Sequence, residues 1–148
     1  AKGMGGGMPI GAFISSKENM DYLSVNPALG HITTFGGHPI SCAAALATFN
    51  TLKKSNIIAS VNNKRQLFET CLKHPAIKQI HGKGLMIAVE FDNEAICQNT
   101  VKQVLKNGVI TFYFLFDRKS MRISPPLNIS EKDIMKACQI IITTLDNQ

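Results

Sequence analysis

Segments that can bury an apolar face are unevenly distributed along this 148-residue chain, and this asymmetry constrains the fold most strongly. From about residue 56 onward, the pattern predicts helix, strand, helix, one or two strands, and a final helix, which is typical of a small α/β unit. Residues 1–37 offer one expected strand, PIGAFIS, and much glycine-rich loop, with nothing for them to pack on. We therefore expect the chain to be the carboxyl-terminal part of a longer protein.

The individual elements follow from periodicity and from helix-capping residues. Ser16 is a candidate N-cap for one or two helical turns, and Pro39 suits the first turn of a longer helix. Asn107-Gly108 is a typical helix end, and Ser130 opens a capping-box-like sequence. The expected elements are a loop over 24–37, helices at about 39–54, 57–73, 96–105 and from 131 onward, and strands at GLMIAVEF and within VITFYFLF.

The net charge of +6 is concentrated in one stretch of the sequence. Residues 51–83 hold seven basic residues against Glu69 alone, whereas the remaining sequence is balanced. Such a strip is compatible with a nucleic acid or an acidic surface, but only Phe68 lies among these charges to stack on a base. A solvated helix face is the favoured interpretation. A non-catalytic basic binding domain stays open as an alternative, and no nucleic-acid partner is expected.

Several functional classes lack their sequence signals. No apolar run reaches the roughly 18 residues of a membrane span, so no membrane partner is expected. The histidines lack metal-ligand spacing, so no metal site is expected, and Met8 stands where a dinucleotide-binding glycine pattern needs its last glycine. The four cysteines form no CxxC pair, and we interpret them as reduced, mostly buried thiols of a cytoplasmic protein: Cys42, Cys71, Cys97 and Cys138.

Three remaining features point to one chemistry. Lys2 precedes a glycine run, and a lysine amine that is held neutral can form a Schiff base. The turn TTFGG offers hydroxyls and backbone N–H groups that suit a phosphate. The arginine in MRISPPL offers a bidentate fork for a carboxylate. Together they outline a pyridoxal-phosphate enzyme that acts on amino acids.

Four motifs in order carry a family resemblance: AKGMGGGMPIGAF, GHITTFGGHPISCAAAL, GKGLMIAVEF and MRISPPLNIS. Together they resemble the carboxyl-terminal part of a class III pyridoxal-phosphate aminotransferase, closest to the ornithine and acetylornithine aminotransferases. The resemblance implies an α/β fold, the carboxyl-terminal part of a fold type I transferase. Residues 1–50 would be the end of the large cofactor-binding domain with the linking helix, and residues 51–148 the small α/β domain.

The resemblance also implies roles for individual residues. Lys2 matches the catalytic lysine that binds pyridoxal 5′-phosphate covalently. Thr34, with Thr33 beside it, matches the threonine that binds the phosphate of the neighbouring subunit's cofactor, which implies a homodimer with shared active sites. Arg122 matches the arginine that binds the substrate carboxylate. His38 stands where asparagine is commonest in the family, and we expect this to alter the loop without abolishing it.

The implied activity is transfer of an amino group from an ornithine-like or acetylornithine-like donor to a 2-oxo acid such as 2-oxoglutarate. Another class III enzyme, such as an aminomutase, decarboxylase or racemase, would also keep Lys2. The family's ring-stacking and pyridine-pairing residues would precede this sequence. The 148-residue chain alone is therefore expected to be inactive.

Overall fold

The computed structural model describes residues 2–28 and 30–148, and it divides the chain after Asn56 into two units. The first unit is Ala1–Asn56 and the second is Ile57–Gln148. The division expected after residue 50 falls inside the long helix α2 (Pro39–Lys54), which belongs to the first unit. That the two parts belong to a large and a small domain stays a prediction.

The first unit consists of a 3₁₀ turn and two helices. The turn η1 (Lys2–Gly5) packs against α2, and α1 (Lys17–Asp21) begins at Ser16, whose hydroxyl accepts a hydrogen bond from the Asn19 N–H. The expected strand over residues 9–15 does not form in the described structure. A single strand needs a neighbour for its backbone N–H and C=O groups, and this unit supplies none among its described residues.

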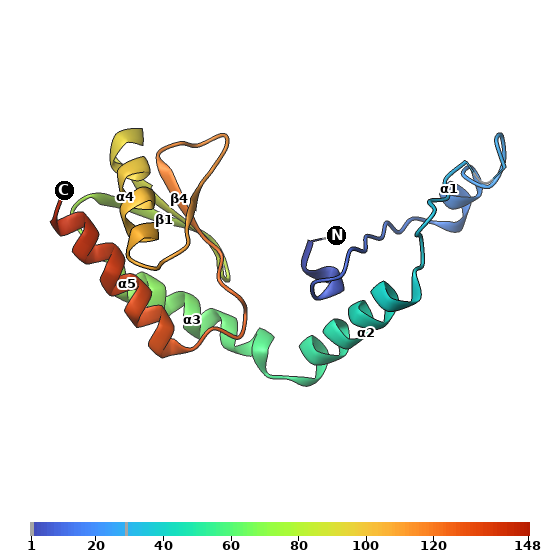
Figure 1. The fold of residues 1–148 in the computed structure, drawn as a ribbon, viewed down its shortest axis with the longest axis horizontal. Coiled ribbons are helices and arrows are strands. Elements are labelled where there is room, and N and C mark those ends of the chain that lie inside the picture. Colours follow the sequence, from blue (N-terminus) through green and yellow to red (C-terminus); the bar gives the residue numbers. More distant parts are fainter. Residues whose placement is uncertain (1, 29) are drawn as a thin grey trace. The chain divides into compact units, whose positions relative to one another are not determined.

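The second unit is a four-stranded antiparallel sheet with three helices (Figure 1). The strand order is β1-β2-β4-β3, so the last strand of the chain lies inside the sheet. The elements are α3 (Ile57–Cys71), β1 (Ile77–Lys83), β2 (Met86–Phe91), α4 (Glu94–Lys106), β3 (Phe112–Tyr113), β4 (Ser120–Ile123) and α5 (Glu131–Asp146).

The core of the second unit lies on one face of this sheet. Ile87, Val89 and Phe91 alternate along β2 and are fully buried, and the residues between them are less buried. The three helices contribute the other side of the same core through Phe68, Leu72, Cys97, Val104, Ile134, Cys138, Ile141 and Leu145. The opposite face of the sheet is therefore the one that displays polar side chains.

Two strand predictions were incomplete. The whole run VITFYFLF was expected to be β-prone, but only Phe112–Tyr113 pairs with β4, since the backbone turns before Ser120. Strand β1 was missed because its sequence, IKQIHGK, holds few apolar residues and does not alternate strictly. It forms through its pairing with β2, and Gly82 permits that pairing: a Cβ there would lie 1.9 Å from the Met86 carbonyl oxygen.

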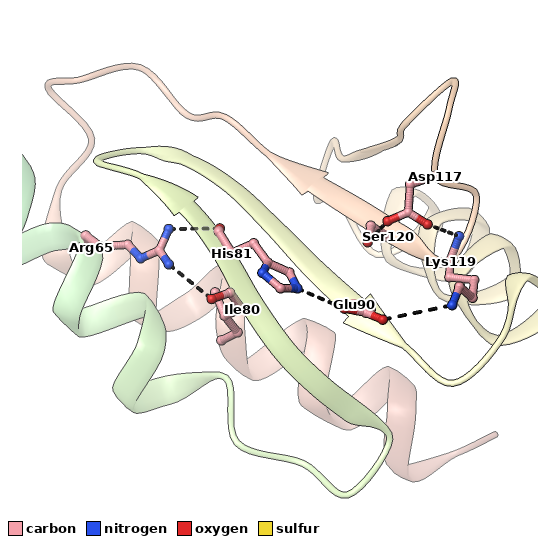
Figure 2. Close-up of polar contacts among 7 residues, drawn as sticks. All are labelled: Arg65, Ile80, His81, Glu90, Asp117, Lys119 and Ser120. Atoms are coloured by element: carbon pink, nitrogen blue, oxygen red, sulfur yellow. Dashed lines mark hydrogen bonds and ion pairs between the residues drawn. The ribbon is translucent and has the colours of Figure 1, made fainter.

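Part of the basic strip has a structural task. The Arg65 guanidinium donates hydrogen bonds to the Ile80 and His81 carbonyl oxygens at 3.4 and 3.1 Å (Figure 2). Its Nε also pairs with Glu69 at 2.6 Å. Only 12% of the Arg65 side chain is exposed, so this charge anchors β1 to α3 and does not belong to a solvated face. Lys64 likewise donates to the Leu127 carbonyl oxygen.

Candidate active-site residues

Lys2 lies in η1 with an exposed side chain and a backbone φ of 60°. This left-handed conformation is uncommon for a residue other than glycine, asparagine or aspartate. Residues held in such strained conformations cluster at functional sites. The observation adds a second reason, independent of sequence, to single out this lysine.

The glycine run after Lys2 is explained by its approach to α2. Gly6 has a φ of 55°, and a Cβ on it would lie 2.2 Å from the Thr48 hydroxyl oxygen. That hydroxyl is itself held by the Ala44 carbonyl oxygen at 2.9 Å. A side chain at position 6 would therefore displace η1 from α2, and the lysine with it.

Thr33 and Thr34 line a cavity of about 440 Å³ together with the beginning of α2. His38 occupies the N-cap position of this 16-residue helix, and its side chain makes no capping hydrogen bond. The positive end of the helix dipole and the two threonine hydroxyls make this cavity suited to a phosphate. Lys2 belongs to the same unit but is not among the residues that line the cavity: Pro9, Ile10, Gly11, Thr33, Thr34, Phe35, Gly36, Gly37, His38 and Ser41.

Arg122 lies in the second unit, on β4, where it pairs with Ala88 of β2 and Phe112 of β3. Directly opposed residues share a face of the sheet, so these three lie in one row on the face away from the core. The Arg122 guanidinium carbon is 5.6 Å from the centre of the Phe112 ring, a cation–π contact. Arg122 also contributes to a second cavity, of about 580 Å³, with Asp133 and Lys136 of α5.

The same face of the sheet carries a polar cluster that the sequence analysis did not single out. Glu90 accepts from His81 at 2.8 Å and lies 4.0 Å from the Lys119 ammonium (Figure 2). Nearby, the Ser120 hydroxyl donates to Asp117 and thereby lowers the pKa of that carboxyl. The alternation of β2 was the signal: it places Glu90 on the face opposite Val89, the same face as Ala88.

Neither a candidate metal cluster nor a candidate membrane-spanning helix occurs among the residues that the structure describes. Among them, no three histidine, cysteine or acidic side chains gather to hold a metal ion. None of the described helices is long and apolar enough to cross a membrane.

The second unit is a small α/β unit with an antiparallel sheet, and the first holds a lysine beside a glycine run and a turn suited to a phosphate. The family model Aminotransferase class-III matches residues 1–145, and the chain therefore belongs to the class III aminotransferases. This family depends on pyridoxal 5′-phosphate, and its fold is the one that the sequence resemblance implied.

Solved structures agree with this assignment. The ornithine aminotransferase of Toxoplasma gondii, which has partial occupancy of the cofactor at its active site, is 31% identical with a TM-score of 0.74. The match covers 88% of this chain and 31% of the Toxoplasma gondii chain. An adenosylmethionine-8-amino-7-oxononanoate aminotransferase from Methanocaldococcus jannaschii shares the fold, at 23% identity and a TM-score of 0.68 over 81% of this chain and 30% of its own. A Bacillus anthracis aminotransferase also shares the fold, at 24% identity and a TM-score of 0.72. The match covers 82% of this chain and 31% of the Bacillus anthracis chain.

The chain thus spans about a third of the length of these solved structures. Within that third, the first unit offers one group suited to the aldehyde of a cofactor and others suited to a phosphate, which by the family resemblance belong to two different cofactor molecules. The primary amine of Lys2 suits the aldehyde, and the threonine hydroxyls with the beginning of α2 suit the phosphate. The individual roles of Lys2, Thr33, Thr34 and Arg122 stay predictions.

Proposed function

We propose that this chain is part of a pyridoxal-phosphate-dependent aminotransferase that moves an amino group from an ornithine-like or acetylornithine-like donor to a 2-oxo acid. The observation that carries the proposal is the family match over residues 1–145, which includes Lys2 and its glycine run. The likeness to the Toxoplasma gondii ornithine aminotransferase supports the choice of donor class.

Lys2 is the residue that we assign to the chemistry. When bound, pyridoxal phosphate supplies an electron sink for the substrate's Cα. Lys2 Nζ would hold the cofactor before substrate arrives and, once released, would take the proton from the Cα of the amino donor. In the second half-reaction the same amine would deliver a proton to the carbon of the acceptor that becomes the new Cα. A primary amine on a flexible four-carbon stem suits both duties.

Thr33 and Thr34 hold the phosphate in this proposal. Their hydroxyls donate hydrogen bonds, and the positive end of α2 attracts the phosphate charge. By the family resemblance, the phosphate belongs to the neighbouring subunit's cofactor. The proposal therefore includes a homodimer in which each subunit completes the site of the other.

Arg122 holds the substrate carboxylate. Its guanidinium offers two parallel N–H donors, which fix the orientation of the substrate as well as its charge. Stacking on Phe112 limits the directions in which the guanidinium points, since the ring occupies one of its faces. Both the amino donor and the oxo-acid acceptor carry this carboxylate, so Arg122 serves each half-reaction.

The proposal is tested by substrate profiling of the longer protein that it requires. The cofactor-loaded enzyme is offered ornithine or N-acetylornithine with 2-oxoglutarate, and glutamate formation is measured. We expect glutamate with at least one donor and none with the Lys2→Ala variant, whereas Lys17→Ala, at an exposed lysine paired with Asp21, serves as the matched control. Decarboxylation, racemisation or amino migration without glutamate would assign the protein to another class III reaction.

A further inference from the structure

Helices α3 and α5 lie side by side in the second unit and run in the same direction (Figure 1). Lys64 of α3 donates to the carbonyl oxygen of Leu127, just before α5, at 2.7 Å. His74, just after α3, lies 3.3 Å from the carboxylate of Asp146 at the end of α5. One contact just before α5 and one at its end therefore tie α5 to the second half of α3 and the residues after it.

Each of these two helices carries a cysteine in the stretch that the two contacts bracket. Cys71 ends α3 and Cys138 lies in the middle of α5, so both fall between these two contacts. Cys138 is a member of the buried core and Cys71 packs against it. The Cys71 thiol also lies close enough to act on Cys138: burial, and secondarily the Cys71 thiol, raises the pKa of Cys138 to about 12.

The two thiols differ in access to solvent. Cys71 is half-buried, whereas only 1% of Cys138 is exposed. An oxidant in solution therefore reaches Cys71 first. Cys138 is protonated at neutral pH and reacts only after Cys71 beside it has been oxidised. This is the arrangement of an attacking thiol with a resolving thiol.

We propose that Cys71 and Cys138 form a reversible disulfide between α3 and α5 when the protein meets a peroxide. This redox device goes beyond the proposed aminotransferase activity, because it uses neither Lys2 nor the threonine and arginine sites. It covalently joins the first and last helices of the second unit, and thus encloses the whole sheet and α4 in one loop.

The chemistry balances with hydrogen peroxide as the only oxidant. The Cys71 sulfur attacks one peroxide oxygen, the O–O bond breaks, and a sulfenic acid and one water result. The Cys138 sulfur then attacks the Cys71 sulfur, the S–O bond breaks, and the Cys138 proton leaves with the hydroxide as a second water. Two thiols are oxidised to one disulfide while one peroxide is reduced to two waters, and a dithiol reverses the step.

The test is peptide mapping of the 148-residue chain under non-reducing conditions after treatment with hydrogen peroxide. We expect a linked pair of peptides that contain Cys71 and Cys138, and its loss after dithiothreitol. Because the bond closes a long loop, the unfolding equilibrium constant in urea should fall roughly 100-fold on oxidation. The double variant Cys42→Ser, Cys97→Ser, which removes one exposed and one buried cysteine, should behave in the same way.

A second variant keeps the test decisive if the disulfide itself is too slow to accumulate. In Cys138→Ser the sulfenic acid on Cys71 has no resolving partner, and a dimedone probe should label Cys71 several-fold more strongly than in the unsubstituted chain. Equal labelling in both, or linkage of Cys71 to Cys42 instead, would overturn the proposal. So would a peroxide-treated chain in which both thiols remain free and alkylate fully after unfolding.

Discussion

The two units differ in how far their apolar side chains are exposed. In the second, Phe68 and Phe91 are at most 1% exposed, because helices and sheet bury each other. In the first, Phe13 and Phe49 are more than 60% exposed, and only Gly5 and Ser41 are buried among its described residues. The second unit therefore contains its own core, whereas the first carries apolar faces for surfaces that it does not itself supply. A small domain beside the end of a larger one, which the family resemblance implies, stays a prediction.

The largest expected effect compares one phenylalanine from each unit. Phe68→Ala should lower the free energy of unfolding of the 148-residue chain by about 3–5 kcal/mol, because it leaves a cavity in the core. Phe49→Ala, on the exposed face of α2, should change it by about 0.5 kcal/mol or less. Urea titration followed by circular dichroism measures both. Equal losses would mean that the first unit has a core of its own.

The next effect concerns Arg122 in the longer protein. Replacing it by lysine keeps the charge but removes the bidentate fork, and should weaken transition-state binding of both donor and acceptor by about 2–4 kcal/mol. Arg118→Lys, at an exposed arginine paired with Glu94, is the matched control and should change it by about 0.5 kcal/mol or less. Both half-reactions are measured separately by kcat/KM. Cofactor loading should stay unchanged, and an effect on the donor alone would mean that another residue holds the acceptor.

A smaller effect tests why glycines follow Lys2. Gly6→Ala places a Cβ against Thr48 in a left-handed conformation, and should destabilise the packing of η1 on α2 by about 1–3 kcal/mol. The Cβ of Gly3→Ala meets no atom within 4 Å, so this variant should change the stability of the η1–α2 packing by about 0.5 kcal/mol or less. Hydrogen exchange of the α2 amides in the 148-residue chain reports the difference. Unchanged exchange in Gly6→Ala would contradict the close approach.

The smallest effect compares two helix caps with the same chemistry. The Ser130 hydroxyl accepts from the Asp133 N–H at 3.1 Å and caps the 16-residue α5, so Ser130→Ala should lower the free energy of unfolding by about 1 kcal/mol. The Ser16 hydroxyl caps α1, which has five residues and no buried side chain, and Ser16→Ala should lower it by about 0.3 kcal/mol or less. Urea midpoints of the two variants give the comparison. A larger loss at Ser16 would show that α1 packs against more than the structure describes.

Local signals were sufficient where an element supplies its own boundaries. Ser16, Ser130 and the Asn107-Gly108 pair were recognised as capping residues, and each stands at a helix boundary in the structure. The run GLMIAVEF was likewise predicted to be a strand, and β2 lies within it. These features depend on residues a few positions apart, so the sequence displays them directly.

Features that depend on a partner were not predictable in the same way. Strand β1 forms because β2 lies beside it. Residues 9–15 form no strand because no other strand lies beside them in the described structure. The sequence also gave no sign that Arg65 would donate to β1 carbonyl oxygens, since sixteen positions separate it from His81. At the candidate site, residue chemistry and the family resemblance singled out Lys2, Thr33, Thr34 and Arg122, but the Phe112 ring beside Arg122 follows from strand register.

The central claim is that Lys2 is the residue that binds the cofactor. Borohydride reduction of the cofactor-loaded longer protein, followed by peptide mapping, tests it most directly, because reduction fixes the lysine–cofactor bond permanently. The account predicts a pyridoxyl group on the peptide that begins the class III match, at Lys2, and its absence in the Lys2→Ala variant. A pyridoxyl group on Lys17 or on any other lysine, with Lys2 unmodified, would contradict it.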